Sequence, residues 1–236
     1  MLLDRVKRSI PPDLSIVPKS TPIPYFGNYA LAKACTISIN PSYREFTDAK
    51  GCILKRERLA SRARLGCDDS EQLSAEDAQT VIQSCDAYFN QENNPYRGWF
   101  NKYEEYIQQF GYSYYDNSCV HLDLVQWATS PVWSGLTEDV RKRLLQTDIP
   151  FLKHLLEKQF DMVFLNGRTT VSQVASCLKL EVVESTITFR QRKATVYQGK
   201  LNDTNVIGCS LYLQSRSVGG YANIRELAKL IIEHNR

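Results

Sequence analysis

The chain has 236 residues, of which 43% are hydrophobic and 23% charged, a balance typical of a globular protein long enough to bury a full core. A net charge of +3 is too small to indicate a nucleic-acid partner by itself. No apolar run approaches the roughly 18 residues of a membrane span, and residues 1–12 lack the apolar core of a signal peptide. We therefore expect one soluble, cytoplasmic domain that spans residues 1–236 and acts as a monomer without contacting a membrane.

The seven cysteines are scattered, and none forms a C-x-x-C pair. An odd number of dispersed cysteines favours reduced, buried thiols over disulfides, a zinc site or an iron–sulfur cluster. We expect neither a bound metal nor any other cofactor.

Residues 1–30 are predicted to form an extended N-terminal arm, because five of the nine prolines fall within residues 10–27. An apolar, β-branched strand is predicted at residues 34–39, and Asn40-Pro41 is the turn that ends it. Ligands bind beyond the carboxyl ends of strands in an open α/β sheet, which places Asn40 at the rim of a cleft. The alternative is a plain strand-ending turn in which Asn40 has no function.

Basic residues concentrate in residues 50–65, where Glu57 is the one acidic residue and we predict a short helix. Such a run forms either a solvated face or a surface that contacts DNA phosphates, with Arg62 and Arg64 as candidates.

Two further helices are predicted before the next strand. Residues 74–77 resemble a capping box and open a helix that ends near Phe89. Residues 96–110 carry aromatic side chains at spacings of three and four, with Gly111 as the stop. This aromatic stripe favours core packing over a platform on which bases stack.

The second notable strand covers residues 119–124, where apolar residues alternate with His121 and Asp123. A period of two places these two polar side chains on the same face, with Asp123 near the carboxyl end of the strand.

Two short helices are predicted after it, one from Thr137 and one from near Asp148. A third buried strand covers residues 162–165, and Asn166-Gly167-Arg168 leads into a helix whose first backbone N–H groups are free to bind an anion. The remaining elements are strands at 181–190, 193–198 and 205–209, a loop at 214–220, and a last helix from Asn223.

Three stretches, taken in order, resemble motifs of the uracil-DNA glycosylase superfamily. Ile39-Asn40-Pro41-Ser42 is similar to the first motif of its mismatch-specific and single-strand-selective branches. His121-Leu122-Asp123-Leu124-Val125 resembles the central strand that reads the base, and residues 208–217 resemble the loop that enters the DNA minor groove. The resemblance spans roughly residues 22–235. It implies a three-layer α/β/α domain with a mainly parallel central sheet, and a duplex or single-stranded DNA substrate from which a pyrimidine is flipped.

The chain departs from the family at two positions. Asn40 replaces the catalytic aspartate of the most active branch, and Gln214 stands where the second motif carries a catalytic histidine. The resemblance makes Asn40 the residue that positions the attacking water and Gln214 a donor that stabilises the departing base. Because an amide cannot take the proton of the water, we expect slow turnover unless the leaving group is good.

Asp123 and Ser42 indicate which base is bound. Uracil readers of the family carry an amide where this chain has Asp123, whereas an ionised aspartate only accepts hydrogen bonds and suits the N4 amino group of cytosine. Ser42 is small where the family has a bulky aromatic residue that excludes groups on C5. Together they predict excision of a 5-modified cytosine, such as the glucosylated hydroxymethylcytosine of phage DNA, as antiviral defence. A protonated Asp123 would still read uracil, and an Asp123 paired with an arginine or with His121 would read no base.

The resemblance also assigns the remaining site residues. Phe46 is the first candidate to stack on the flipped base, with Tyr43 or Trp127 as alternatives, and His121 lies beside the base reader. Arg216 or a neighbour is expected to wedge into the vacated stack, while phosphates are contacted by the basic segment and by Ser215, Ser217 and Arg168.

Two alternatives to this prediction stay open. One is a glycosylase that repairs uracil or mismatches, and the other is a catalytically degenerate member of the same fold that only binds DNA. A nucleoside hydrolase or deoxyribosyltransferase fits less well, because the basic segment and residues 211–220 would then have no role.

Overall fold

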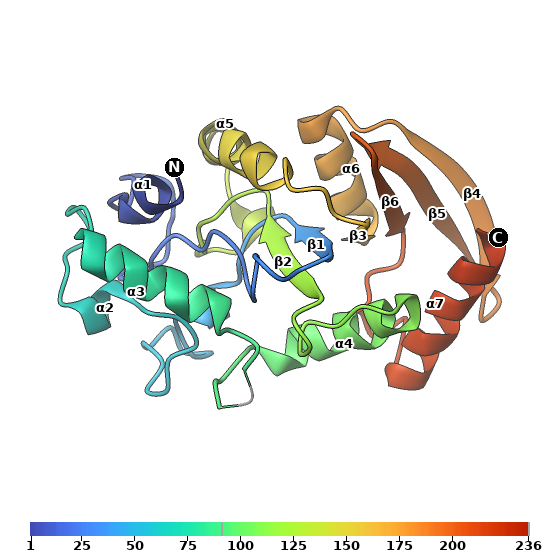
Figure 1. The fold of residues 1–236 in the computed structure, drawn as a ribbon, viewed down its shortest axis with the longest axis horizontal. Coiled ribbons are helices and arrows are strands. Elements are labelled where there is room, and N and C mark those ends of the chain that lie inside the picture. Colours follow the sequence, from blue (N-terminus) through green and yellow to red (C-terminus); the bar gives the residue numbers. More distant parts are fainter. Residues whose placement is uncertain (91, 236) are drawn as a thin grey trace.

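The computed structural model describes residues 1–90 and 92–235. They form a single α/β domain built on a six-stranded, mostly parallel sheet with the order β2-β1-β3-β6-β5-β4 (Figure 1). The strands are β1 Ala34–Ser38, β2 Cys119–Asp123, β3 Met162–Asn166, β4 Val182–Phe189, β5 Arg192–Leu201 and β6 Thr204–Cys209. Every strand predicted from the sequence is present, with boundaries within a few residues of those expected.

Four neighbouring strands, β2, β1, β3 and β6, run parallel, whereas β5 and β4 pair antiparallel at the far side of β6. Nearly every residue of β1, β2 and β3 is buried, as expected of strands that are covered on both faces. Their carboxyl ends consequently lie at one edge of the sheet, and the segments that follow them meet there.

Helices flank the sheet. In Figure 1, α5 and α6 lie to one side of the strands, and α4 and α7 to the other. The helices are α1 Leu2–Lys7, α2 Arg62–Leu65, α3 Ala75–Asp86, α4 Arg97–Ile107, α5 Glu138–Leu155, α6 Arg168–Leu178 and α7 Tyr221–His234, with short 3-10 helices η1 Tyr43–Glu45, η2 Gln108–Phe110 and η3 Trp133–Gly135. Among the described residues, no helix is both long and apolar enough to cross a membrane.

Local signals account for several helix ends. The Ser74 hydroxyl accepts a hydrogen bond from the Asp77 N–H at 3.0 Å and caps α3, as the capping-box pattern predicts. Gly111, at φ 85°, ends the α4–η2 segment in the left-handed conformation that glycine adopts at least cost.

Two of the predictions are wrong, whereas the short helix predicted within residues 50–65 is present as the four-residue α2. Residues 2–7 form helix α1 rather than part of an extended arm. The two helices predicted from Thr137 and Asp148 are the single helix α5, with Pro150 in its interior. The buried side chains along α5, among them Leu144, Phe151 and Leu152, hold this helix together despite the backbone hydrogen bond that proline cannot donate.

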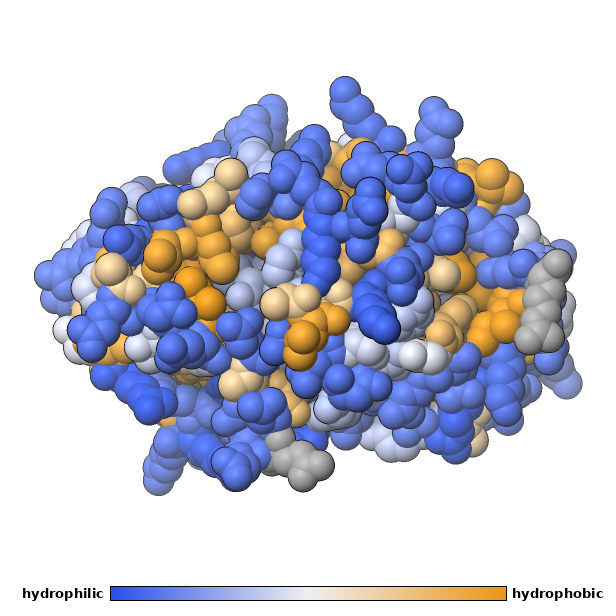
Figure 2. All heavy atoms as spheres, viewed as in Figure 1, coloured by the Kyte–Doolittle hydropathy of each residue, from blue (hydrophilic) through white to orange (hydrophobic). Residues whose placement is uncertain are grey.

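Apolar side chains fill the space between the sheet and the helices on both sides, and the seven cysteine thiols are all free. On the face seen in Figure 2, hydrophilic side chains cover most of the surface and apolar side chains form separate patches.

Candidate functional site

The ends of the four parallel strands open into one cavity of about 590 Å³. It receives Asn40 after β1, Asp123 from β2, Asn166 from β3 and Ser210 after β6. The predicted convergence of these strand ends is therefore confirmed. Asn40 and Asp123 are 83 positions apart in the chain, and the parallel pairing of β1 with β2, which sets Ser38 beside Asp123, brings them to the same hollow.

The side-chain amide of Asn40 is held in place through its nitrogen atom, Nδ2. Its Nδ2 donates to the carbonyl oxygens of Pro41 at 3.2 Å and Trp127 at 3.4 Å, and lies 3.0 Å from the Thr129 hydroxyl. Because carbonyls only accept, these contacts determine which end of the amide is nitrogen. Oδ1 receives no hydrogen bond from the described chain, and it is therefore available to orient a water molecule.

Asp123 lies at the cavity wall with 3% of its surface exposed. Its Oδ1 is buried without a hydrogen-bond partner in the described part of the protein, and His121 Nε2 lies 3.6 Å away. That separation is too long for a good hydrogen bond. Oδ1 is closed off from the cavity, but the other carboxylate oxygen, Oδ2, also accepts no hydrogen bond from the described residues, which leaves the Asp123 carboxylate with acceptor capacity for a ligand.

His121 is fixed from behind by hydroxyl groups. Its Nδ1 lies 2.6 Å from the Thr36 hydroxyl, which in turn lies 2.7 Å from the Tyr114 hydroxyl. We assign the protons so that Tyr114 donates to Thr36 and Thr36 donates to Nδ1, which leaves the Nε2–H directed at Asp123. The predicted placement of His121 and Asp123 on one face of β2 is confirmed.

Glu45 is a cavity residue that the sequence analysis missed. It belongs to η1, is 3% exposed, and accepts a hydrogen bond from the Tyr88 hydroxyl at 2.6 Å. Burial raises the pKa of Glu45 to about 7; the Asp123 charge acts in the same direction, and the Tyr88 hydrogen bond and the Arg58 charge oppose it. The available signal was its position in the loop after Asn40, three residues beyond the small Ser42.

Aromatic rings form much of the remaining wall. Phe26, Trp99 and Phe100 surround His121 with ring centroids 5.1–5.5 Å from the imidazole, and Tyr43 lines the cavity beside Ser42. The aromatic stripe of α4 is therefore only partly core, since Trp99 and Phe100 also border the hollow.

The structure does not place Phe46, the first candidate to stack on a flipped base, at the cavity. Phe46 is buried and does not line the cavity, and neither does Trp127, which is completely buried. Glu45 lines the cavity, whereas the adjacent Phe46 packs in the hydrophobic core. Of the three predicted candidates, Tyr43 is the one that borders it.

Gln214 does not reach the cavity either. Its Oε1 accepts from Asn166 Nδ2 at 2.7 Å, and its Nε2 donates to the Trp99 carbonyl at 3.2 Å. The Asn166 Oδ1 also accepts the Leu213 N–H at 2.9 Å. Both ends of the Gln214 amide are thus occupied in joining β3 and α4 to the segment after β6, and the predicted catalytic role of Gln214 does not fit this placement.

Arg168 is exposed at the cavity mouth, where it is the first residue of α6. Gly167 precedes it with φ at 91°, and a Cβ there would approach Tyr212 to 3.3 Å, so the turn needs glycine. The predicted strand–glycine–helix junction is confirmed, and it brings a cation and the positive end of a helix dipole to the rim.

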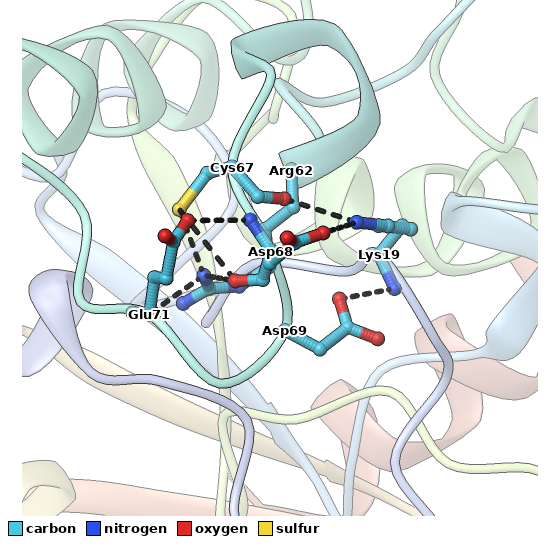
Figure 3. A network of polar contacts seen from close by, with 6 residues as sticks. All are labelled: Lys19, Arg62, Cys67, Asp68, Asp69 and Glu71. Carbon is cyan, nitrogen blue, oxygen red and sulfur yellow. Dashed lines mark hydrogen bonds and ion pairs between the residues drawn. The ribbon is translucent and has the colours of Figure 1, made fainter.

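Arg62 was predicted to contact DNA phosphates, but it is completely buried. Its guanidinium donates to the carbonyl oxygens of Arg8, Asp68 and Glu71 at 2.6–2.8 Å, and Figure 3 shows it among Asp68, Glu71 and Cys67. Five donors in a planar fork suit this task of satisfying several carbonyls at once. The prediction failed because the charge of a side chain does not reveal whether it points outward.

Much of the remaining basic segment is also engaged. Arg56 donates to the Glu92 carbonyl, and Arg58 donates to the carbonyls of Arg44 and Asn94. Arg64 is exposed and forms an ion pair with Glu57 at 3.3 Å. Its contact with DNA stays a prediction.

Residues 215–217 follow the cavity residue Tyr212 in the loop between β6 and α7. Arg216 and Ser217 are exposed, and the Ser215 and Ser217 hydroxyls lie 2.8 Å apart. None of the three lines the cavity, so a minor-groove role for this loop stays a prediction.

In the part of the chain that the structure describes, no three His, Cys, Asp or Glu side chains are grouped so that they could hold a metal ion. In comparisons with known proteins, no family model, curated protein or solved structure matches the chain significantly.

Proposed function

We propose that the protein is a DNA glycosylase that binds an everted pyrimidine in the cavity and hydrolyses its N-glycosidic bond to leave an abasic site. The observation that carries the proposal is the shared cavity of Asn40 and Asp123, whose amide oxygen and carboxylate accept no hydrogen bond from the described residues. A cavity of about 590 Å³ falls within the roughly 300–1,000 Å³ that ligand pockets span.

In the proposed reaction, the bond between C1′ and N1 breaks and its electron pair leaves with the base. The sugar passes through an oxocarbenium-like state, water then adds to C1′, and the proton that it loses neutralises the departing base anion. Asn40 Oδ1 accepts a hydrogen bond from that water and fixes its position. The aromatic wall formed by Trp99, Phe100 and Tyr43 holds the flat base and excludes bulk water.

The base is proposed to be a 5-modified cytosine, with glucosylated hydroxymethylcytosine of phage DNA as the example and antiviral defence as the role. Asp123 offers acceptor oxygens that suit the N4 amino group, and the small Ser42 lines the cavity where a bulky residue would exclude a C5 substituent. Arg168 at the mouth is suited to a phosphate next to the flipped nucleotide.

The finer aspects of the architecture and setting belong to the same proposal. We infer a three-layer α/β/α arrangement of the uracil-DNA glycosylase kind, acting as a cytoplasmic monomer on duplex or single-stranded DNA. The mostly parallel sheet flanked by helices supports this inference.

The test is base release from defined duplexes that carry cytosine, uracil, thymine opposite guanine, or glucosylated hydroxymethylcytosine at one position. Abasic sites in the last duplex, and few or none in the others, are the expected result. Release of uracil alone would replace the proposal with a repair function. Binding of these duplexes without any base release would replace it with a degenerate, DNA-binding protein of this fold.

A further inference from the structure

Two carboxyl groups from different parts of the chain, Glu45 and Asp123, line the same cavity. Each is 3% exposed, and neither is within ion-pair distance of a lysine or arginine in the described part of the protein. Two unneutralised carboxylates that face one small hollow repel each other, and ionising both of them is costly. One proton shared by the pair removes most of that cost.

Burial and the nearby Asp123 favour the neutral form of Glu45, whereas the Tyr88 hydrogen bond and the Arg58 charge oppose it. The Tyr88 hydroxyl accepts the Tyr96 N–H at 2.9 Å, and its own proton is therefore directed at Glu45 Oε2. That bond leaves Oε1 without a partner among the described residues. The charged groups that act on Glu45 are Arg58, whose guanidinium is spent on the Arg44 and Asn94 carbonyls, and Asp123.

Asp123 supplies the second, independent observation. Its Oδ1 is buried and lacks a hydrogen-bond donor within the described chain, although His121 Nε2 lies 3.6 Å away. Oδ1 is closed off from the cavity beside His121, and the other oxygen, Oδ2, also accepts no hydrogen bond from the described residues, so it is Oδ2 that remains for an N–H group of a bound molecule. Asp123 is therefore the acceptor of the pair, and Glu45 is the group that carries the proton.

We propose that Glu45 and Asp123 act as one proton-sharing carboxyl pair that determines base specificity, with Asp123 accepting an N–H of an exocyclic amino group and Glu45 supplying the hydrogen-bond donor to the ring nitrogen beside it. This inference rests on the proposed function and deepens it. The amino group and neighbouring acceptor nitrogen are the N4 and N3 of a cytosine-type base. Uracil has the acceptor O4 where cytosine has the N4 amino group, and a donor N3–H where cytosine has an acceptor. Its O4 would therefore face the Asp123 carboxylate without a hydrogen between them.

The experiment measures single-turnover base release as a function of pH, with the substrate of the preceding section, for the wild-type protein and for Glu45→Gln. Wild-type release is expected to fall about tenfold for each pH unit above the pKa of Glu45, about 7, because the donor is lost. The Glu45→Gln variant keeps an N–H donor at every pH, and we expect it to retain release within about threefold of the wild-type maximum without that fall.

A larger loss of activity in Glu45→Gln, or a wild-type rate that rises through pH 7, would overturn the proposal, since both would mean that the ionised carboxylate is the active form. Asp123→Asn is the matched second variant. It should shift release from the cytosine-type base toward uracil, because an amide both donates and accepts hydrogen bonds. An unchanged base preference would contradict the proposal that the carboxyl pair determines specificity.

A readout without catalysis separates this inference from the proposed function. The infrared difference spectrum of the free protein minus Glu45→Gln should contain a protonated carboxyl band below pH 7 that disappears above it. If no base is released but the band is present, the proposed function is wrong while the proposal of a shared proton stands. If a base is released but the band is missing, the proposal of a shared proton is wrong while the function stands.

Discussion

Two regions of this protein gather charged side chains in its interior, and they differ in whether those charges find protein partners. Around the buried Arg62, both terminal nitrogens of the guanidinium donate to backbone carbonyls, whereas Nε has no partner among the described residues; the partly exposed Lys19 beside it contacts Asp68 (Figure 3). At the cavity, neither the Asp123 carboxylate nor the Asn40 amide oxygen accepts a hydrogen bond from the described residues. The guanidinium of the first region is held by several carbonyls of the protein itself, whereas the carboxylate of the second accepts no hydrogen bond from the described residues.

This difference separates a structural role from a functional one. A buried charge that is fully hydrogen-bonded stabilises the chain around it, and removing it leaves its partners unsatisfied. A buried polar atom without a partner costs stability, and it persists where binding or catalysis needs it. Four substitutions test the comparison, from the largest expected effect to the smallest.

Arg62→Met should lower the free energy of unfolding by about 3–5 kcal/mol, because the carbonyls of Arg8, Asp68 and Glu71 lose their buried donors. The measurement is denaturant unfolding. Arg64→Met, two residues away on an exposed side chain, is the matched control and should change stability by at most about 0.5 kcal/mol. Equal, small effects of both substitutions would show that the network around Arg62 contributes nothing.

Asn40→Ala should reduce base release by about 10²–10³-fold and leave DNA affinity within a few fold, since the lost group orients the water and not the DNA. Single-turnover cleavage and equilibrium binding measure the two effects separately. Asn205→Ala, at an exposed position of β6, is the control and should change neither quantity. Loss of binding in parallel with cleavage would instead assign Asn40 a structural role through its contacts with Pro41 and Trp127.

Glu45→Gln should change how stability depends on pH. The pKa of Glu45 is raised by burial from its ordinary 4.5 to about 7, so between these values the folded protein keeps a proton that the unfolded chain releases. The free energy of unfolding of the wild type should therefore decline as pH rises through this window, by up to about 3 kcal/mol. The variant should lack that decline. Parallel curves for the two proteins would mean that Glu45 is ionised throughout.

Arg168→Ala should have the smallest effect of the four substitutions, a slight weakening of DNA binding. If Arg168 contacts one phosphate, the slope of log affinity against log salt concentration should become less negative by about one. Lys142→Ala, an exposed cation on α5 that does not line the cavity, should leave the slope unchanged. An identical slope for wild type and Arg168→Ala would remove Arg168 from the DNA surface.

The sequence is enough to predict the strands, the turn at Asn40 and the placement of His121 and Asp123 on one face of β2. A period of two and an Asn-Pro turn are local features of the chain. Once the strands are known to be parallel, their carboxyl ends must meet, and Asn40 and Asp123 come together as a consequence. The capping of α3 by Ser74 was predictable for the same reason, since its two groups are three residues apart.

Only the tertiary structure decided which polar side chains face the cavity and which are consumed elsewhere. Arg62 is buried among carbonyls, Gln214 bridges two distant elements, and Phe46 turns inward while the adjacent Glu45 faces the hollow. Each of these outcomes depends on partners far away in the chain, and the cost of burying a polar group is determined by whether such a partner is present. The sequence identifies candidates for chemistry, and long-range packing determines which of them remain available for it.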